Sequence, residues 1–259
     1  MNLDKSFLSG ELKKIWKGNL YLYRELESTQ IVAKELAEKG EEEGSVVLAE
    51  RQTQGRGRGK NRWYSPPGGL YFTLILRPPI ERKKINCLSF VFSLSVAEKI
   101  YDFTRLLPQI KWPNDILINR RKVCGMLIEA KGKEKISYVL AGIGVNVNSE
   151  REDFPPPLRE TLTTLKEETT QPLDLENFFL QLLKTIHTHY EELKAGFFSD
   201  ILGKWQRFSL PSGERIEFTS SQGKIKGILW GVDEEGYLHL RTQDGKIITV
   251  REGEVVWLP

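Results

Sequence analysis

The 259-residue chain has few of the residues from which metal centres and disulfide frameworks are built. It contains two cysteines, Cys87 and Cys124, and three histidines, scattered widely along the sequence. This set cannot supply a structural zinc site, which needs four cysteine or histidine ligands at short spacings. One disulfide could form, but two free buried thiols in a cytoplasmic protein are the better interpretation.

Long apolar runs and a strong excess of one charge are also missing. No stretch approaches the roughly 18 apolar residues of a membrane helix, and the N-terminus shows no signal-peptide pattern. Lysine and arginine (38) exceed aspartate and glutamate (35) by only three, which does not favour general nucleic-acid or membrane binding. We therefore expect a cytoplasmic protein without a membrane partner. The length and the 39% apolar content predict one or two folded domains.

Hydrophobic periodicity predicts an α+β fold for most of the chain. A helix is predicted over residues 30–39, after a Ser28-Thr29 cap, and a buried apolar helix over residues 87–103. Between residues 110 and 148, short β-rich segments are joined by tight turns, which indicates antiparallel pairing.

The clearest helix runs from Asp174 to Gly196, with apolar residues at helical spacing. His187 is predicted beside the apolar stripe of this helix and His189 off it. Both histidines are therefore predicted to be structural or surface residues rather than ligands.

The last fifty residues have a different character. Five short β-rich segments are joined by Gly/Asp turns: "RIEFTS", "GKIKGILWGV", "GYLHLRT", "KIITV" and "EVVWLP". This pattern indicates a small β-barrel. We predict a main domain over residues 1–205 and a barrel domain over residues 206–259.

The segment "QTQGRGRGKNRW" (52–63) combines glycines and basic residues in a way that packs no core. It is not a Walker loop, because only three residues separate Gly55 from Gly59-Lys60 and Asn61 replaces the hydroxyl residue. It is not a dinucleotide-binding loop either, because Lys60 stands where the last glycine is required.

The same segment still has the chemistry of an anion-binding loop. Its glycines let successive backbone N–H groups approach an anion, and Arg56 and Arg58 present forked donors that suit carboxylate and phosphate oxygens. We expect the loop to be mobile without a ligand and ordered by one. A solvated basic loop without function remains the alternative on this window alone.

The segment "KWPNDILINRRKVCGMLIEA" (111–130) predicts a second cluster of charge. Its turns bring Lys111, Asp115 and Lys122 to one end of the sheet. Gly125, inside a strand, is typical of a bulge or of a close backbone approach.

The segment "GIGVNVN" (142–148) predicts a strand with the same property. Gly142 and Gly144 weaken the strand unless a ligand or another backbone lies close. Asn146 and Asn148, two residues apart, are predicted to project to one face.

In this order the segments resemble those of biotin–protein ligases. The resemblance covers nearly the whole chain, and the GRGR, KWPND and GIGxNVN motifs are specific in combination. It implies a class II synthetase-like ligase core, with a mixed, largely antiparallel sheet and helices, followed by a small C-terminal SH3-like β-barrel. The motifs that carry the resemblance are "ESTQ" (27–30), "QTQGRGRGKNRWYSPPGGLYFTLIL" (52–76), "KWPNDILINRRKVCGMLIEA" (111–130) and "GIGVNVN" (142–148).

The resemblance also implies a reaction. Such enzymes are ligases that form a carbon–nitrogen bond: they activate biotin with ATP to biotinyl-5′-AMP and pass the biotinyl group to one lysine of a carrier domain. The implied cofactor and substrates are Mg²⁺, ATP and biotin, with Mg²⁺ on the ATP phosphates and no protein metal ligand. The implied partner is the biotin carboxyl carrier protein of acetyl-CoA carboxylase. The oligomeric state is left open, with a homodimer as one option.

Family positions imply a role for each matching residue. Lys122, Arg58 and Lys111 are the implied catalytic residues. The implied biotin-binding residues are Ser28, Thr29, Gln30, Gln52, Arg56, Gly57, Arg58, Lys122, Gly125 and Gly144. The implied nucleotide-binding residues are Gly55, Arg56, Trp63, Lys111, Asn114, Asp115 and Asn146.

The sequence departs from the family pattern in three places. Gln30 stands where asparagine is common, Cys124 where alanine is common, and residues 59–62 redistribute the loop charges. Some members carry an N-terminal DNA-binding domain. Here 26 residues precede "ESTQ" (27–30), too few for such a domain, so we expect the ligase without the repressor and no DNA partner.

Two alternative functions are kept open. A lipoate–protein ligase shares the adenylate chemistry, but the GRGRG and KWPND pair disfavours it. A nucleic-acid-binding module would use the basic loop as an arm, but one Gly-Arg cluster in a nearly neutral chain disfavours that reading.

Overall fold

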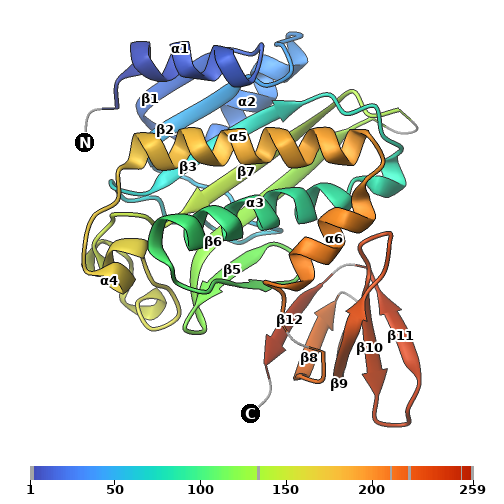
Figure 1. Cartoon of the computed structure of the whole chain (residues 1–259). Helices are drawn as coiled ribbons and strands as arrows, with labels where there is room; N and C mark the ends of the chain where they lie inside the picture. Colours follow the sequence, from blue (N-terminus) through green and yellow to red (C-terminus); the bar gives the residue numbers. More distant parts are fainter. Residues whose placement is uncertain (1–2, 133–134, 211, 221–222, 252, 258–259) are drawn as a thin grey trace.

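A seven-stranded mixed sheet forms the centre of the larger part of the molecule (Figure 1). The computed structural model describes residues 3–132, 135–210, 212–220, 223–251 and 253–257. The strand order is β1-β2-β3-β7-β6-β5-β4. The strands are β1 (Leu20–Leu26), β2 (Val46–Gln52), β3 (Leu70–Leu76), β4 (Gln109–Lys111), β5 (Asp115–Ile118), β6 (Arg121–Lys131) and β7 (Tyr138–Val145). Only β1 and β2 pair in parallel, so the predicted mixed, largely antiparallel sheet is confirmed.

Helices cover both faces of this sheet. One face is covered by α3 (Cys87–Thr104), with α5 (Leu175–Lys194) packed beside it and α1 (Lys5–Ile15) against α5, as Figure 1 shows. The opposite face carries α2 (Thr29–Glu38), which packs on β2, β3 and β7. The remaining helical segments are α4 (Leu165–Thr169), α6 (Phe198–Gln206) and the 3₁₀ turns Arg82–Lys84, Arg151–Asp153 and Pro156–Leu158.

The two faces have cores of different size. The large core lies between the sheet and the α3–α5 layer, where Phe72 of β3 meets Phe179 of α5 with ring centroids 5.3 Å apart. The small core lies under α2 and contains Ala33, Ala37 and Leu140. Because α2 covers only part of its face, one end of the sheet is left open for a site.

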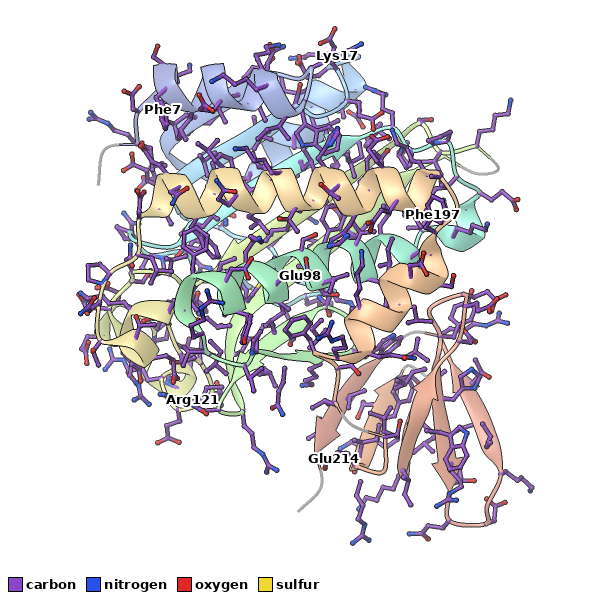
Figure 2. All side chains as sticks on the ribbon, viewed as in Figure 1. Phe7, Lys17, Glu98, Arg121, Phe197 and Glu214 are labelled. Atoms are coloured by element: carbon purple, nitrogen blue, oxygen red, sulfur yellow. The ribbon has the colours of Figure 1, made fainter. Side chains whose placement is uncertain are left out.

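The prediction that His189 lies off the apolar stripe of α5 is wrong. The side chain is buried, with 4% exposed, and contacts Glu98 of α3 at 2.9 Å and Glu192 of its own helix at 2.7 Å. Glu98 is labelled on α3 in Figure 2. Lys204 of α6 donates to the same Glu192 at 3.0 Å. Of the two predicted roles, structural or surface, the histidine has the structural one, because it joins three helices.

The C-terminal segment forms a separate five-stranded antiparallel sheet in the order β11-β10-β9-β8-β12 (Figure 1). Its strands are β8 (Arg215–Ser220), β9 (Gly223–Val232), β10 (Leu238–Thr242), β11 (Ile247–Val250) and β12 (Glu254–Trp257). The five predicted segments match these strands, except that residues 258–259 lie outside the described part of the chain.

This C-terminal sheet packs directly on the larger part. The indole of Trp112 donates to the Gly236 carbonyl at 3.2 Å, and its ring centroid lies 6.3 Å from that of Phe218. Ile110, the middle residue of β4, forms a parallel β-bridge with Ser209. The helix α6 ends at Gln206, beside the predicted division between residues 205 and 206.

Two further expectations can be compared with the structure. Cys87 and Cys124 are free and buried, as predicted. Within the described ranges, no helix is both long and apolar enough to cross a membrane.

Candidate active site

A cavity of about 280 Å³ opens at the end of the sheet that α2 leaves uncovered. Every predicted site residue lines this cavity except Gly55 and Asn146. The lining residues from the prediction are Ser28, Thr29, Gln30, Gln52, Arg56, Gly57, Arg58, Trp63, Lys111, Asn114, Asp115, Lys122, Gly125 and Gly144. Segments more than a hundred residues apart in sequence therefore meet at one place.

The floor of the cavity is made of glycines on two neighbouring strands. Gly125 of β6 pairs directly with Gly144 of β7. A Cβ atom on Gly144 would lie 2.4 Å from Trp63 Nε1, and one on Gly125 would lie 2.8 Å from Trp63 Cζ3. The indole thus rests on bare backbone, which is the close approach that glycines in a strand indicate. No polar atom of the described residues bonds the buried Trp63 Nε1.

A β-bulge aims Lys122 at this floor. In the β5–β6 pair, Ile116 faces Cys124 but the next residue, Leu117, faces Lys122, so Val123 is the extra residue. A bulge shifts the alternation of side chains by one position. Lys122 therefore comes to the same face as Gly125, where a glycine Cβ would lie 3.1 Å from its Nζ.

The Lys122 ammonium has two neighbours in the cavity. Its Nζ lies 2.7 Å from Asp115 Oδ1 and 5.3 Å from the centre of the Trp63 ring. The lysine and aspartate side chains are 35% and 22% exposed, so the pair is accessible to a ligand. Arg56, Arg58 and Lys111 line the same cavity. This excess of cations favours an anionic ligand.

The N-terminus of α2 supplies polar groups at the other end of the cavity. Ser28 occupies the N-cap position, as predicted, but its hydroxyl makes no capping bond. The Thr29 N–H donates instead to Gln52 Oε1 at 2.8 Å. Ser28 Oγ is buried, and no partner for it exists among the described residues. It is therefore free to bond a ligand.

Two residues that the sequence analysis missed extend this polar end. Thr73, fully buried in β3, lies 2.9 Å from Thr29 Oγ1 and 3.1 Å from Gln30 Oε1. Glu129 of β6 accepts a hydrogen bond of 2.9 Å from Gln30 Nε2. The hydroxyl residue inside the apolar run "LYFTLIL" is the sequence signal that could have identified Thr73 as part of this polar end. Nothing in the sequence marks Glu129.

The basic loop is folded as a short hairpin over the cavity. Trp63 N donates to Gly55 O and Gly57 N donates to Asn61 O, each at 2.9 Å. Gly55 closes the base of this hairpin, which explains why it does not line the cavity. At the tip, Arg58 donates to the carbonyl of Gly253, the residue before β12, at 3.2 Å. Val255 of β12 also lines the cavity, so the smaller sheet completes the site.

A second cavity of about 320 Å³ adjoins the first, sharing Trp63, Asp115 and Lys122 with it. Asn146 lies here rather than in the first cavity. Its amide donates to Thr163 O at 3.1 Å, while its Oδ1 is buried and bonds no described residue. Its lining includes apolar residues that were not predicted, Phe154, Leu158 and Leu162. The remaining lining residues are Arg62, Tyr64, Lys111, Leu117, Arg120 and Thr161.

Among the residues with described positions, no three His, Cys, Asp or Glu side chains are grouped to hold a metal ion.

Asn148, which was predicted to share a face with Asn146, has a structural contact. It donates to Leu173 O and accepts from Leu173 N, both at 2.8 Å, so its amide fixes the following loop.

Comparison with known proteins places this geometry in a family. The model of the biotin/lipoate A/B protein ligase family matches residues 21–146, and that of the biotin protein ligase C-terminal domain matches residues 212–257. The bifunctional ligase/repressor BirA of Bacillus subtilis is 34% identical over 246 residues, which cover 94% of this chain and 76% of that protein. The biotin–[acetyl-CoA-carboxylase] ligase of Paracoccus denitrificans is 32% identical over 213 residues, covering 77% and 85%.

A solved structure agrees over nearly the whole chain. The biotin protein ligase from Aquifex aeolicus, in complex with biotin and ATP, superposes with a TM-score of 0.79 at 34% identity. The match covers 92% of this chain and 97% of that one.

Proposed function

The chain belongs to the biotin protein ligase family, and from this we propose that its cavity activates biotin with ATP and that the biotinyl group then passes to a lysine of a carrier protein. The activation gives biotinyl-5′-AMP and pyrophosphate. The enzyme is a ligase, and biotin and ATP are its substrates. The observation that carries the proposal is the joining of a neutral polar end and a cationic end by one cavity.

The polar end suits the cyclic urea of biotin. A urea has one carbonyl acceptor and two N–H donors. Ser28 offers an unpartnered hydroxyl, and the Gln52 amide group, which bonds Ser65 Oγ at 2.8 Å, has a second proton to donate. Gln30 offers a carbonyl oxygen. A lipoate dithiolane has no such hydrogen-bonding groups, so the burial of these polar atoms favours biotin over lipoate.

The cationic end suits the reacting groups. In the first step a biotin carboxylate oxygen forms a bond to the α-phosphorus of ATP, and pyrophosphate leaves with the electrons of the broken P–O bond. Lys122, Arg56 and Arg58 line the cavity where this negative charge develops. Preorganised cations of this kind stabilise a transition state because they need no rearrangement as the charge forms. We assign Lys111 a supporting charge on the nucleotide side.

The second step needs exclusion of water. The deprotonated amine of the carrier lysine attacks the acyl carbon of the adenylate, and AMP leaves as the amide bond forms. An acyl-adenylate hydrolyses in open solvent. The loop hairpin that carries Arg56, Gly57 and Arg58 lies over the cavity and is placed to shield it.

The second cavity suits the adenine base. Its apolar side chains, Phe154, Leu158 and Leu162, can pack a flat ring, and Asn146 Oδ1 can accept from an exocyclic amine. Trp63 lies between the two cavities, beside both proposed sites. Asn114 and Asp115 lie on the same side. Mg²⁺ would arrive as part of the ATP substrate, bound to its phosphates.

The partner is a biotin carboxyl carrier protein, and we propose that of acetyl-CoA carboxylase as the physiological acceptor. Homodimer formation stays a separate proposal, to be tested by sedimentation with and without biotin and ATP.

Biotin-dependent exchange of labelled pyrophosphate into ATP tests the first step. Transfer of labelled biotin to a carrier domain tests the second. We expect both activities, with unlabelled biotin but not lipoate competing. Adenylation of lipoate in preference to biotin would contradict the proposal. Salt-dependent binding of RNA or DNA without either activity would favour the nucleic-acid reading.

A further inference from the structure

A continuous chain of hydrogen bonds leads from the cavity to a carboxylate on β6. It runs from Gln52 through Thr29, Thr73 and Gln30 to Glu129, with steps of 2.9 to 3.1 Å. Thr29, Gln30 and Thr73 are at most 4% exposed, so water has little access to these three side chains. The direction of each hydrogen bond is therefore set by the linked side chains and not by water.

The carboxylate fixes one end of this chain. An ionised carboxylate can only accept hydrogen bonds, whereas an amide can present either its oxygen or its NH₂ group. Glu129 accepts from Gln30 at 2.9 Å, which forces the NH₂ group of Gln30 toward Glu129. The carbonyl oxygen of Gln30 must then face the other way. A Cβ atom on Gly142, a residue of the cavity lining, would lie 2.6 Å from this oxygen.

The other end of the chain is fixed as well. Gln52 Oε1 accepts from both the N–H and the hydroxyl of Thr29, at 2.8 and 3.1 Å. The hydroxyl proton of Thr29 is used in its bond to Gln52, so Thr29 Oγ1 can only accept from Thr73. Thr73 has one proton and two acceptors within reach, Thr29 Oγ1 and Gln30 Oε1. The amide oxygen of Gln30 has two lone pairs, so it can accept from an N–H group of a ligand whichever acceptor Thr73 bonds.

We propose that Glu129 is a positioning residue for the binding of biotin. Glu129 orients the Gln30 amide so that the amide oxygen accepts an N–H of the cyclic urea. The inference rests on the proposed function. Without the carboxylate, the amide can turn and present its NH₂ group to the urea N–H. Two donors would then face each other in a buried place, which costs affinity. Glu129 bonds Gln30 and not the biotin ring, so it favours binding of the urea without touching the reacting atoms.

A double-mutant cycle on biotin affinity tests the role. The proteins are wild type, Glu129→Gln, Gln30→Met and the double variant, with the biotin Kd, the ATP KM and the Tm measured for each. Glu129→Gln keeps the side-chain volume but no longer dictates the amide direction. We expect it to weaken biotin binding roughly 5- to 30-fold, as the loss of one buried hydrogen bond does. The ATP KM and the Tm should not change.

The decisive comparison is in the Gln30→Met background. If Glu129 acts through Gln30, Glu129→Gln should have no further effect there. An exchange variant, Gln30→Glu with Glu129→Gln, again places an acceptor-only carboxylate against an amide, and should recover most of the affinity that Glu129→Gln loses. This variant keeps the test informative if Gln30→Met fails to fold.

Glu25→Gln is the matched control, since it removes a carboxylate of the same sheet that pairs with exposed Arg51 outside the cavity. It should leave the biotin Kd unchanged. Unaltered affinity in Glu129→Gln, or equal losses in both Gln30 backgrounds, would overturn the inference alone. Absence of biotin binding by the wild-type protein would instead contradict the proposed function, and the inference with it.

Discussion

The ammonium of Lys122 lies 2.7 Å from Asp115 Oδ1, across the hairpin that joins β5 to β6. Both side chains are partly exposed, so the pair contributes little to the stability of the fold. Its effect is geometric: the carboxylate holds the lysine beside the glycine floor before a ligand arrives. A substrate carboxylate or phosphate can then share the ammonium without a search among rotamers.

We predict that Lys122→Ala cripples adenylate formation and leaves the fold intact. Loss of one preorganised electrostatic contact reduces the rate by roughly 10²- to 10³-fold. Single-turnover formation of biotinyl-AMP is the measurement. Lys224→Ala is the control, because Lys224 makes an ion pair of the same 2.7 Å length with Glu217 on the C-terminal sheet. A near-normal rate in Lys122→Ala would rule out the assigned role.

Gly144→Ala is expected to displace Trp63 from the cavity floor. The new methyl group would lie 2.4 Å from Nε1 and 2.5 Å from Cε2 of the indole, and the neighbouring atoms are ring atoms that cannot yield by rotation of a flexible end. Tryptophan fluorescence and the Kd values of biotin and ATP should all change. Gly203→Ala in α6 is the control, since no atom lies within 4 Å of its added Cβ. It should be neutral or slightly stabilising, by up to about 1 kcal/mol. An unchanged ligand affinity in Gly144→Ala would show that Trp63 does not need its present position.

Arg58→Gly should weaken retention of the adenylate more than it harms folding. The residue sits at the tip of the loop hairpin, and its guanidinium bonds the carbonyl of Gly253, just before β12. Loss of a charged hydrogen bond corresponds to roughly tenfold faster escape of the intermediate. Labelling of bystander lysines by released biotinyl-AMP measures this escape. Lys60→Gly removes a charge from the same turn and should not raise the labelling. Labelling confined to the carrier in Arg58→Gly would contradict a role of Arg58 in retaining the adenylate.

Deletion of residues 207–259 is expected to impair adenylation as well as transfer. From the sequence alone the C-terminal strands form an independent unit, whose loss would mainly affect the carrier step. In the structure, Val255 lines the cavity and Gly253 O accepts from Arg58, so the first step also depends on this sheet. Pyrophosphate exchange by the truncated protein measures the dependence. Full pyrophosphate exchange with failed transfer would show that the C-terminal sheet is needed only for the carrier step.

The His189 cluster predicts how stability depends on pH. Burial lowers the pKa of His189, but the hydrogen bonds and charges of Glu98 and Glu192 raise it by more, so the net pKa lies above its ordinary 6.5. A raised pKa stabilises the folded state fully below 6.5, and the contribution is lost as the pH rises through the folded value.

The pKa of Glu192 shifts the opposite way. Burial raises it, and His189 and Lys204 lower it by more, to a net value below 4.5, so this contribution is present above 4.5 and is lost in acid. His189→Gln should therefore lose most stability between pH 4.5 and 6.5, by roughly 1.5–3 kcal/mol, and less at pH 9. Urea unfolding at one pH between 4.5 and 6.5 and at pH 9 measures the difference in the free energy of unfolding. An equal loss at both would mean that the histidine acts by packing alone.

Local patterns were enough to predict the elements, the basic loop and the charged turn, whereas the family resemblance supplied most of the other cavity residues. The segment "RIEFTS" was predicted at the observed bounds of β8, and the glycines of β6 and β7 were correctly linked to a close approach. These features depend on residues near one another in sequence. The Gln30–Glu129 contact joins residues 99 positions apart, and no local rule predicts such a pair. The walls of the second cavity were missed for the same reason, since Phe154 and Leu162 look like ordinary loop residues.

The extra residue in β6 has a consequence for chain length. Deletion of Val123 would remove the β5–β6 bulge and restore strict alternation, so that Lys122 would turn to the buried face. Gly125 and Gly144 would still be available to pair. Such a protein should bind the uncharged part of its substrate but lack the charge that the reaction needs. At this hairpin, the number of residues matters to the chemistry as much as their identity, and a sequence library for this enzyme should hold the interval from Asp115 to Gly125 at constant length.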